Sequence, residues 1–138
     1  MVRINLINPK KLADQHLVAE YLEVLMLLGY VRKNPSIEAI PKNYCLGRGH
    51  VKFFKNKLLY LKNRHNLIKS EMSSRGFATN KSISLKNFKK ELKNDWKPKK
   101  QDYETIKSRL RFKINKKPNY YRYFREKKSK DFFFNLLN

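Results

Sequence analysis

Apolar residues recur at steps of three and four positions along the longest segments of this chain, and that spacing limits its fold more than any other feature. In the segment from Asp14 to about Lys33, the recurring residues are Leu17, Tyr21, Val24, Leu25, Leu28 and Val31. This spacing places side chains on one face of an α-helix, and no segment shows the sustained alternation of a β-strand. Only 4 glycines and 5 prolines interrupt the chain, and Asp14 is a residue type that caps helices. The sequence therefore predicts an all-α fold.

Two further long helices are expected. The second should run from about Phe53 to Arg75 and stop at Gly76, with a buried side made of Leu58, Leu61, Leu67, Ile68 and Met72. The third should run from about Asp102 to Asn115, and a shorter surface helix is expected from Ser84 to Asn94. Because 138 residues have room for one hydrophobic core, we expect residues 1–138 to form a single compact domain of three main helices.

The charge of the chain points to nucleic acid as its partner. The 33 Lys and Arg against 11 Asp and Glu give a formal net charge of +22, far more than solubility requires, and a polyanion would offset the repulsion. No apolar segment is long enough to span a bilayer, and the N-terminus lacks a secretory pattern. Cys45 is the single cysteine, so no internal disulfide can form. We expect a cytoplasmic monomer without a membrane role, associated with the nucleoid when bound to DNA.

The first helix carries a candidate catalytic face. His16, Glu20 and Glu23 are spaced i, i+4 and i+7, so all three should share one side of the helix. Leu27 continues the same side, and partial desolvation would raise the pKa of a carboxyl group there, which suits acid–base catalysis. The other interpretation is that these acids simply pair with some of the many cations.

The start of the chain is a second candidate. Val2 is small enough for Met1 to be removed, which would expose an α-amine. The reference pKa of such an amine, about 7.7 to 8.0, leaves a useful neutral fraction at pH 7, and a neutral amine forms a Schiff base with a sugar aldehyde. Every protein has an N-terminus, however, so this hypothesis depends on further support.

That support comes from a family resemblance carried by several motifs. The opening of the chain reads Arg3-Ile4-Asn5-Leu6, Leu12-Ala13-Asp14-Gln15-His16-Leu17, Ala19-Glu20-Tyr21, Glu23 and Val31-Arg32-Lys33. Later motifs are Leu46-Gly47, Gly49-His50-Val51, Phe53-Phe54, Lys57-Leu58, Arg75-Gly76-Phe77, Arg109-Leu110, Lys113-Ile114, Pro118, Tyr121 and Tyr123. Together they resemble the pyrimidine-dimer DNA glycosylase and abasic-site lyase family typified by the phage endonuclease V. The resemblance covers roughly residues 1–33, 44–77 and 109–124; residues 78–108 match weakly, and residues 125–138 form a divergent tail.

The resemblance implies a fold and a mechanism. The N-terminal segment should thread between the long helices and bring the α-amine of Val2 beside Glu23. In the family, this amine attacks the sugar of the damaged nucleotide, the base leaves as an imine forms, and β-elimination cuts the strand without a metal or other cofactor. Glu23 would assist these steps, His16 would line the pocket, and Arg3, Arg109 and Lys113 would hold phosphates of damaged double-stranded DNA.

Other residues are candidates for DNA binding. Arg48 lies in the motif Gly47-Arg48-Gly49-His50, close to Lys52 and Lys55, and this segment either binds a phosphate or forms a simple turn. Near the C-terminus, Lys117, Tyr120 and Arg122 belong to a basic, aromatic segment whose rings stack on bases or pack against the first helix. The spacing of Cys45 and the histidines is not that of a zinc site, so no metal is expected.

Leu22 and Met26 depart from the family, which commonly has arginines flanking the catalytic carboxylate. Their loss removes phosphate contacts close to the lesion. Three functions therefore stay open. The first is a glycosylase and abasic-site lyase acting on cyclobutane pyrimidine dimers, the second an abasic-site lyase or a glycosylase for another lesion, and the third a non-enzymatic basic nucleic-acid-binding protein.

Overall fold

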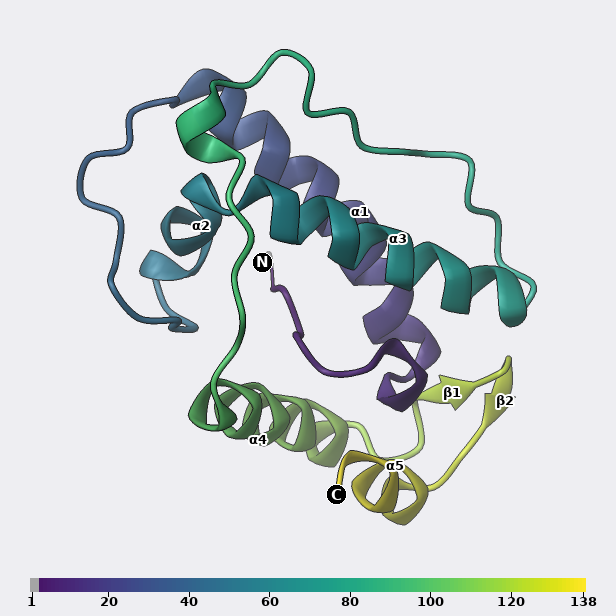
Figure 1. Ribbon diagram of the computed structural model, residues 1–138. Coiled ribbons are helices and arrows are strands. Elements are labelled where there is room, and N and C mark those ends of the chain that lie inside the picture. The colour runs from purple at the N-terminus through teal and green to yellow at the C-terminus, as the bar shows by residue number, and fades with distance from the viewer. Residues whose placement is uncertain (1–2) are drawn as a thin grey trace.

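The computed structural model describes residues 3–138, and helices dominate that part of the chain (Figure 1). The helices are α1 (Asp14–Lys33), α2 (Gly49–Phe53), α3 (Leu58–Ser74), α4 (Lys100–Lys116) and α5 (Lys130–Leu137), with 3-10 turns at Pro9–Lys11, Phe54–Asn56 and Lys90–Leu92. Strands β1 (Arg122–Tyr123) and β2 (Glu126–Lys127) form one short antiparallel pair. The prediction of an all-α fold is confirmed.

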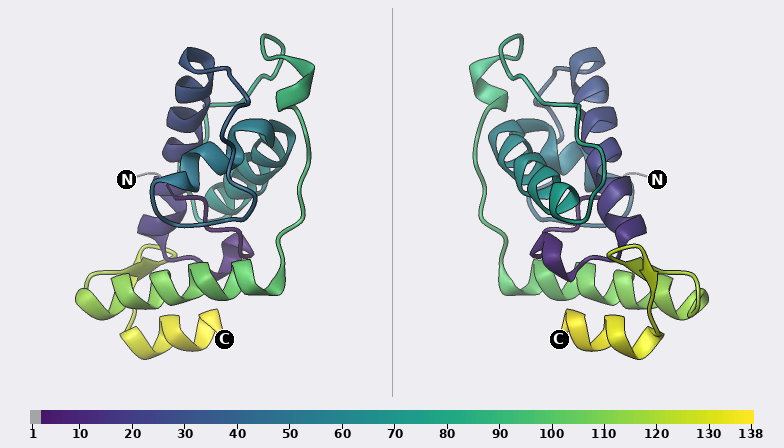
Figure 2. Two further views of the ribbon diagram at one scale, coloured as in Figure 1. Left: turned by 90° about the vertical axis from the view of Figure 1, so that its left-hand side faces the viewer. Right: turned by 90° about the vertical axis from the view of Figure 1, so that its right-hand side faces the viewer.

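The helices form two layers with the N-terminal segment between them. α1 packs against α3 in one layer, and α4 packs against α5 in the other. Residues 3–12 run between the α1–α3 layer and α4, as the two side views also show (Figure 2). The segment is apolar where it is enclosed, since Ile4 is fully buried and Leu6, Ile7 and Leu12 are nearly so. The expected threading of this segment between the long helices is therefore present.

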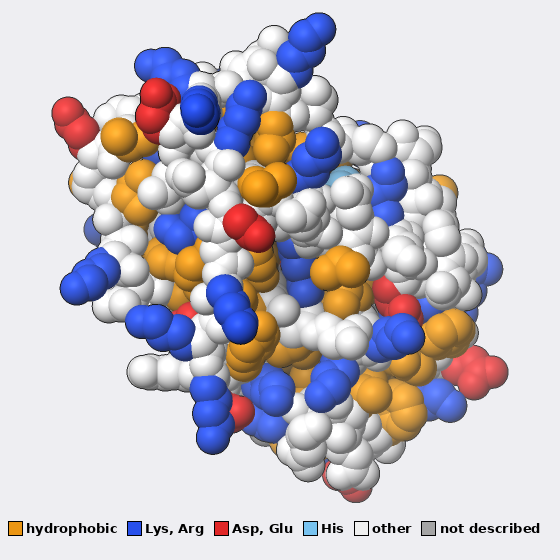
Figure 3. All heavy atoms as spheres, in the orientation of Figure 1, with side chains coloured by type: hydrophobic (Ala, Val, Ile, Leu, Met, Phe, Trp, Pro, Cys, Tyr) orange, Lys and Arg blue, Asp and Glu red, His pale blue; other side chains and the backbone are white. Residues whose placement is uncertain are grey.

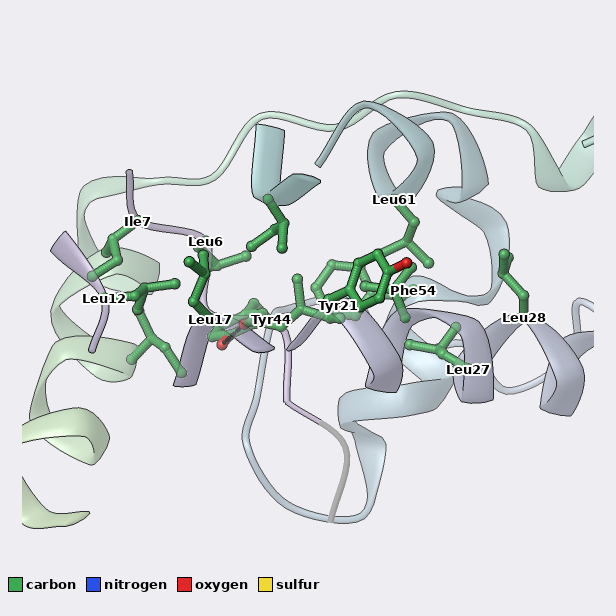
Figure 4. Packing of buried hydrophobic residues seen from close by; sticks show 14 of the residues in the cluster. Leu6, Ile7, Leu12, Leu17, Tyr21, Leu27, Leu28, Tyr44, Phe54 and Leu61 are labelled. Atoms are coloured by element: carbon green, nitrogen blue, oxygen red, sulfur yellow. Dashed lines mark hydrogen bonds between the residues drawn. The ribbon is translucent and has the colours of Figure 1, made fainter. Parts of the chain in front are cut away.

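The hydrophobic core is continuous from the N-terminal segment to α3. Figure 4 shows Leu6 and Leu12 facing Leu17 of α1 at one end, and Leu27 of α1 near Leu61 of α3 at the other. Each fully buried side chain of this kind stabilises the fold by about 1.5–3 kcal/mol. The N-terminal segment is thus an integral part of the core.

The second predicted helix is two elements instead of one. The backbone leaves helical geometry at Lys57, where φ is −127° and ψ is 41°, so α3 begins at Leu58 and not at Phe53. Leu67 was predicted to be buried but is 57% exposed. The inward positions of α3 are Leu61, His65, Ile68 and Met72, and Leu67 lies about 100° around the helix from Ile68. The helix ends before Gly76, as predicted, and the φ of +84° at that glycine suits a residue without a Cβ.

The prediction of a helix from Ser84 to Asn94 is wrong. Apart from the 3-10 turn at Lys90–Leu92, this stretch is not helical; it has no regular structure up to Leu85 and turns at residues 86–88. Ile83 and Leu85 are buried while Ser84 between them is exposed, which is the alternation of an extended chain. Phe88 and Leu92 complete this apolar cover. Tertiary packing therefore overrides the local helical spacing here.

Asp14 does not cap α1 as predicted. Ala13 occupies the cap position, and the Asp14 carboxylate instead accepts a hydrogen bond from Arg75 at 2.9 Å and the backbone N–H groups of Phe124 and Arg125 at 3.1 and 2.7 Å. Phe124 and Arg125 both have positive φ, the geometry of a tight hairpin turn between β1 and β2. This carboxylate therefore fixes the C-terminal hairpin to the beginning of α1.

The C-terminal tail ends in α5, which the sequence did not predict. The Ser129 hydroxyl accepts the Phe132 N–H at 3.1 Å and caps this helix. Phe133 and Leu137 are almost completely buried, so the terminal phenylalanine run covers the core.

Candidate active site

The backbone of the N-terminal segment is held by side chains from several elements. The Arg3 N–H donates to Glu23 Oε2 at 2.8 Å, and the Ile4 N–H donates to His50 Nε2 at 2.8 Å. The Asn5 backbone N–H and side-chain amide both donate to Glu20 Oε1, at 3.2 and 2.9 Å. These contacts place the beginning of the described chain directly beside Glu23.

Glu20 is part of the fold and is closed to solvent. Its side chain is fully buried, and its two oxygens accept hydrogen bonds from the Arg64 guanidinium at 2.7 and 3.0 Å. Arg64 also donates to the Ile7 carbonyl at 2.5 Å. Of the two interpretations of the acids on α1, pairing with a cation is therefore the right one for Glu20.

Glu23 is the half-buried carboxylate of this face. Desolvation by burial raises its pKa; the Arg3 N–H and the positive charge of Arg109 oppose that rise, and the charge of Glu20 adds to it. A raised pKa makes a carboxylate a stronger base, which suits it to proton transfer. Glu23 thus has the properties of an acid–base group.

Arg109 interacts electrostatically with both Glu23 and His16, and Lys113 interacts with His16. Burial, together with the charges of Arg109 and Lys113, lowers the pKa of His16 to about 4. Its ring lies against Tyr121, with 4.7 Å between ring centroids. Burial and the nearby charge of Arg3 lower the pKa of Arg109, and Glu23 opposes that shift. The structure therefore brings together Arg3, His16, Glu23, Arg109 and Lys113, and His16 is neutral at pH 7.

The predicted DNA-binding residues Tyr120 and Arg122 belong to the C-terminal segment and are held against the beginning of α1. The Gln15 side chain donates to the Tyr120 carbonyl at 2.9 Å and accepts the Arg122 N–H at 3.1 Å. Tyr120 is half-exposed, and the ammonium group of Lys117 is 4.9 Å from its ring centroid. Tyr121, in contrast, is buried. In the aromatic segment, Tyr121 thus packs inside the protein, while Tyr120 belongs to an exposed basic surface.

Arg48 lies near Met26 and Tyr30, in the second half of α1. It is exposed and lines a shallow pocket with Met26, Tyr30 and Lys52. Lys55 is nearly buried, with its ammonium group 5.8 Å from the Tyr30 ring. The predicted cluster of three cations therefore contains two that face outward.

The surface of the described chain is strongly basic. Lys and Arg side chains are spread over the whole face seen in Figure 3, and Asp and Glu are few. Asp14, Glu20 and Glu71 are buried in ion pairs with Arg75 or Arg64, so these acids pair with buried arginines and not with the surface cations. Leu22 and Met26 are 45% and 64% exposed beside Glu23.

Several other predictions concern metals, membranes and the chain start. Within residues 3–138, no group of three His, Cys, Asp or Glu side chains has the arrangement of a metal site. None of the described helices combines the length and the apolar character needed to cross a bilayer. Val2, the predicted nucleophile, lies outside the described residues.

Sequence reasoning missed two residues that touch the N-terminal segment. Tyr44 donates its hydroxyl to the Ile4 carbonyl at 3.0 Å, and His50 accepts the N–H of the same residue. His50 was noted only as the neighbour of two glycines, and Tyr44 not at all. No spacing rule connects residues 40 and 46 positions apart in sequence, so this contact became visible only in three dimensions.

Comparison with known families identifies what this chain is similar to. A family model described as pyrimidine dimer DNA glycosylase matches residues 1–85. The matched part contains the N-terminal segment, α1, α2 and α3, together with Arg3, His16, Glu23 and Arg48. Arg109, Lys113 and the C-terminal aromatic segment lie beyond it.

Proposed function

Because the chain belongs to the pyrimidine dimer DNA glycosylase family, we propose that it excises pyrimidine dimers from duplex DNA and then cuts the strand as an abasic-site lyase. In this proposal Met1 is removed, the α-amine of Val2 is the nucleophile, and Glu23 is the acid–base group. The protein acts as a monomer on damaged double-stranded DNA.

The hydrogen bond between the Arg3 N–H and Glu23 is the observation that carries the proposal. One residue spans at most about 3.6 Å along the chain. The Arg3 nitrogen is 2.8 Å from Glu23 Oε2, so covalent geometry alone keeps the α-nitrogen of Val2 within roughly 6.5 Å of that oxygen. A proton passes directly only at hydrogen-bond distance, about 2.6–3.2 Å, and through one bridging water molecule at longer range.

The proposed reaction has two stages. The lone pair of the α-nitrogen forms a bond to the sugar C1′, the bond from C1′ to the base breaks, and its electron pair leaves with the base. Loss of a proton and opening of the sugar ring give an imine. A base then removes a proton from C2′, the C3′–O bond breaks, and the 3′ phosphate leaves; water finally releases the enzyme. The Glu23 carboxylate supports the cationic sugar and takes up the protons.

The layout of the cations supports duplex binding. Gln15, which holds Tyr120 and Arg122, and Met26, which neighbours Arg48, lie eleven positions apart on α1. This distance is about 16 Å along the helix axis, close to five base-pair steps of about 3.4 Å. Arg3 and Arg109 lie near Glu23, between these ends, and Lys113 lies near His16. Phosphate contacts on both sides of the lesion would position its sugar at the carboxylate.

Borohydride trapping tests the proposal. The protein is incubated with a duplex that contains a cyclobutane dimer and with one that contains an abasic site, and reduction of an imine leaves a covalent adduct. Adducts on both duplexes support the proposal. Mass spectrometry of the adduct peptide should place the bond on the nitrogen of Val2; a bond on a lysine, or an acetylated or Met1-bearing terminus in active protein, overturns the mechanism.

A second candidate function has one observation in its favour. Leu22 and Met26 expose apolar side chains where the family commonly has arginines, so the face around Glu23 has fewer phosphate contacts. A lyase for abasic sites, or a glycosylase for another lesion, would tolerate that loss. An adduct on the abasic duplex alone favours this function. No adduct on either duplex favours a non-enzymatic nucleic-acid-binding protein.

A further inference from the structure

We propose that His50 and Tyr44 are positioning residues for the reaction at Glu23. Together they hold both polar groups of the Ile4 backbone and so set the position of the chain start. This inference rests on the proposed function, because it assigns the two residues a purpose in presenting the α-amine.

The hydrogen-bond pattern fixes the state of the His50 ring. Its Nδ1 lies 2.8 Å from the Cys45 carbonyl, which can only accept, and its Nε2 lies 2.8 Å from the Ile4 N–H, which can only donate. The ring must therefore carry its hydrogen on Nδ1 and be neutral. Only the neutral ring has a lone pair for the Ile4 N–H.

The surroundings of His50 favour the neutral ring. The side chain is fully buried, and its ring has edge contacts with Tyr44 and Phe54 at centroid distances of 5.4 and 5.3 Å. Burial lowers its pKa to about 4; the charges of Arg3 and Arg109 act in the same direction, and the Cys45 carbonyl opposes them. The ring therefore remains an acceptor over the physiological pH range.

Tyr44 completes the hold on Ile4. Its hydroxyl donates to the Ile4 carbonyl at 3.0 Å, so both polar groups of this residue are bound to side chains. The Ile4 side chain is itself fully buried. Since the preceding Arg3 N–H is bound to Glu23, two successive amide groups are fixed by α1 and α2. A displacement of about 1 Å at a reacting atom can slow a reaction by about 100-fold, so this anchoring should matter for the chemistry.

Single-turnover trapping on an abasic duplex tests the inference. His50→Leu removes the acceptor, and Tyr44→Phe removes the hydroxyl. We expect each change to slow imine trapping by about 10- to 100-fold, while the Kd for the duplex changes by less than about threefold. His50→Gln retains an acceptor oxygen for the Ile4 N–H and should recover most of the rate. Amide hydrogen exchange at Ile4 should be faster in His50→Leu than in the wild type.

His65→Gln is the matched control. His65 is equally buried and also bonds to a backbone carbonyl, that of Tyr21 at 3.0 Å, and both this hydrogen bond and its ring contact are to Tyr21 and not to residues 3–7. Its variant should trap at the wild-type rate wherever melting curves show folded protein. Should His50→Leu fail to fold, Tyr44→Phe and His50→Gln decide the matter.

Three outcomes overturn the positioning role. They are wild-type rates in both His50→Leu and Tyr44→Phe, a His50→Gln rate as low as that of His50→Leu, or an equal loss in His65→Gln. Trapping with the wild-type protein distinguishes a failure of the positioning role from a failure of the proposed function. Wild-type protein that forms no adduct refutes both, whereas adduct formation that ignores these substitutions refutes the positioning role alone.

Discussion

Glu20 and Glu23 lie one helical turn apart on α1 and bind the backbone of the same N-terminal segment, yet only Glu20 is fully buried and paired with an arginine. Burial raises the pKa of Glu23, whereas the Glu20 oxygens are occupied by Arg64 and Asn5. Their surroundings thus give Glu20 a structural role and leave Glu23 as the proposed acid–base group, and different environments of this kind separate the roles of two carboxylates at other acid–base sites.

Replacing Glu23 by Gln should separate binding from catalysis. The amide retains an oxygen for the Arg3 N–H but cannot accept a proton. We expect base excision to fall by about 100-fold or more, with little change in the Kd for dimer-containing duplex. Single-turnover product formation and a binding titration provide the two measurements. Equal loss of both would refute the assigned role.

The same substitution should change stability in a pH-dependent way. Because the pKa of Glu23 is raised in the folded protein, the folded state binds more protons than the unfolded state, and this group lowers stability as pH rises through the raised pKa. Glu23→Gln has no titrating group at this position and does not lose stability in this way. The melting temperature of the variant minus that of the wild type should therefore be larger at pH 7 than at pH 4. A difference that does not vary with pH would contradict the raised pKa.

Breaking the buried pair of Glu20 and Arg64 should be costly. Glu20→Gln leaves the Arg64 guanidinium buried at 3% exposure without its counter-charge, and such changes cost about 3–5 kcal/mol. Glu126→Gln is the control, because Glu126 is 76% exposed and 3.4 Å from Lys128; it should cost less than about 1 kcal/mol. Urea unfolding measures both values, and similar values for the two variants would refute the distinction.

His16 should titrate far below the usual range. Its pKa is about 4 because of burial, Arg109 and Lys113, and NMR titration of the ring should show this directly. Since His16 binds fewer protons in the folded state than in the unfolded state, its titration lowers the free energy of unfolding as pH falls from about 6.5 to about 4. Arg109→Gln should move the pKa upward; an unchanged value would refute the contribution of Arg109 and leave burial and Lys113 as the causes.

Restoring a cation at Met26 should strengthen DNA binding. Met26→Arg places a guanidinium beside Arg48 on an exposed position of α1. One new phosphate contact should steepen the slope of log K against log salt by about 0.9. Leu67→Arg is the matched control, because Leu67 is comparably exposed but lies on α3, and it should leave the slope nearly unchanged. Equal slopes for both variants would show that Met26 does not face the phosphates.

The fold was predictable where local spacing and tertiary packing agree. α1 has the predicted bounds, and α4 (Lys100–Lys116) differs from its prediction by one or two residues at each end, because their apolar stripes face one core. The prediction failed at Ser84–Asn94, where an extended segment buries Ile83, Leu85 and Phe88. It also missed α5, whose phenylalanines become a helix only when they pack on the core.

The site was predictable to the extent that family motifs carry it. Arg3 and Arg109 lie near Glu23, and Arg109 and Lys113 act on His16; the roles that the resemblance implies for these residues stay predictions. Glu20 was not distinguishable from Glu23 by spacing, since its partner Arg64 is 44 residues away in sequence. The Ile4 contacts of Tyr44 and His50 were hidden for the same reason. Long-range pairs of this kind have no local pattern.

The partners of the N-terminal segment have a consequence for synthesis on the ribosome. Ile4 binds Tyr44 and His50, and Ile7 binds Arg64, so these contacts form only after residues 44, 50 and 64 have been translated. The N-terminal segment is synthesised first, yet it takes its final place in the core only after these later residues have been added to the chain.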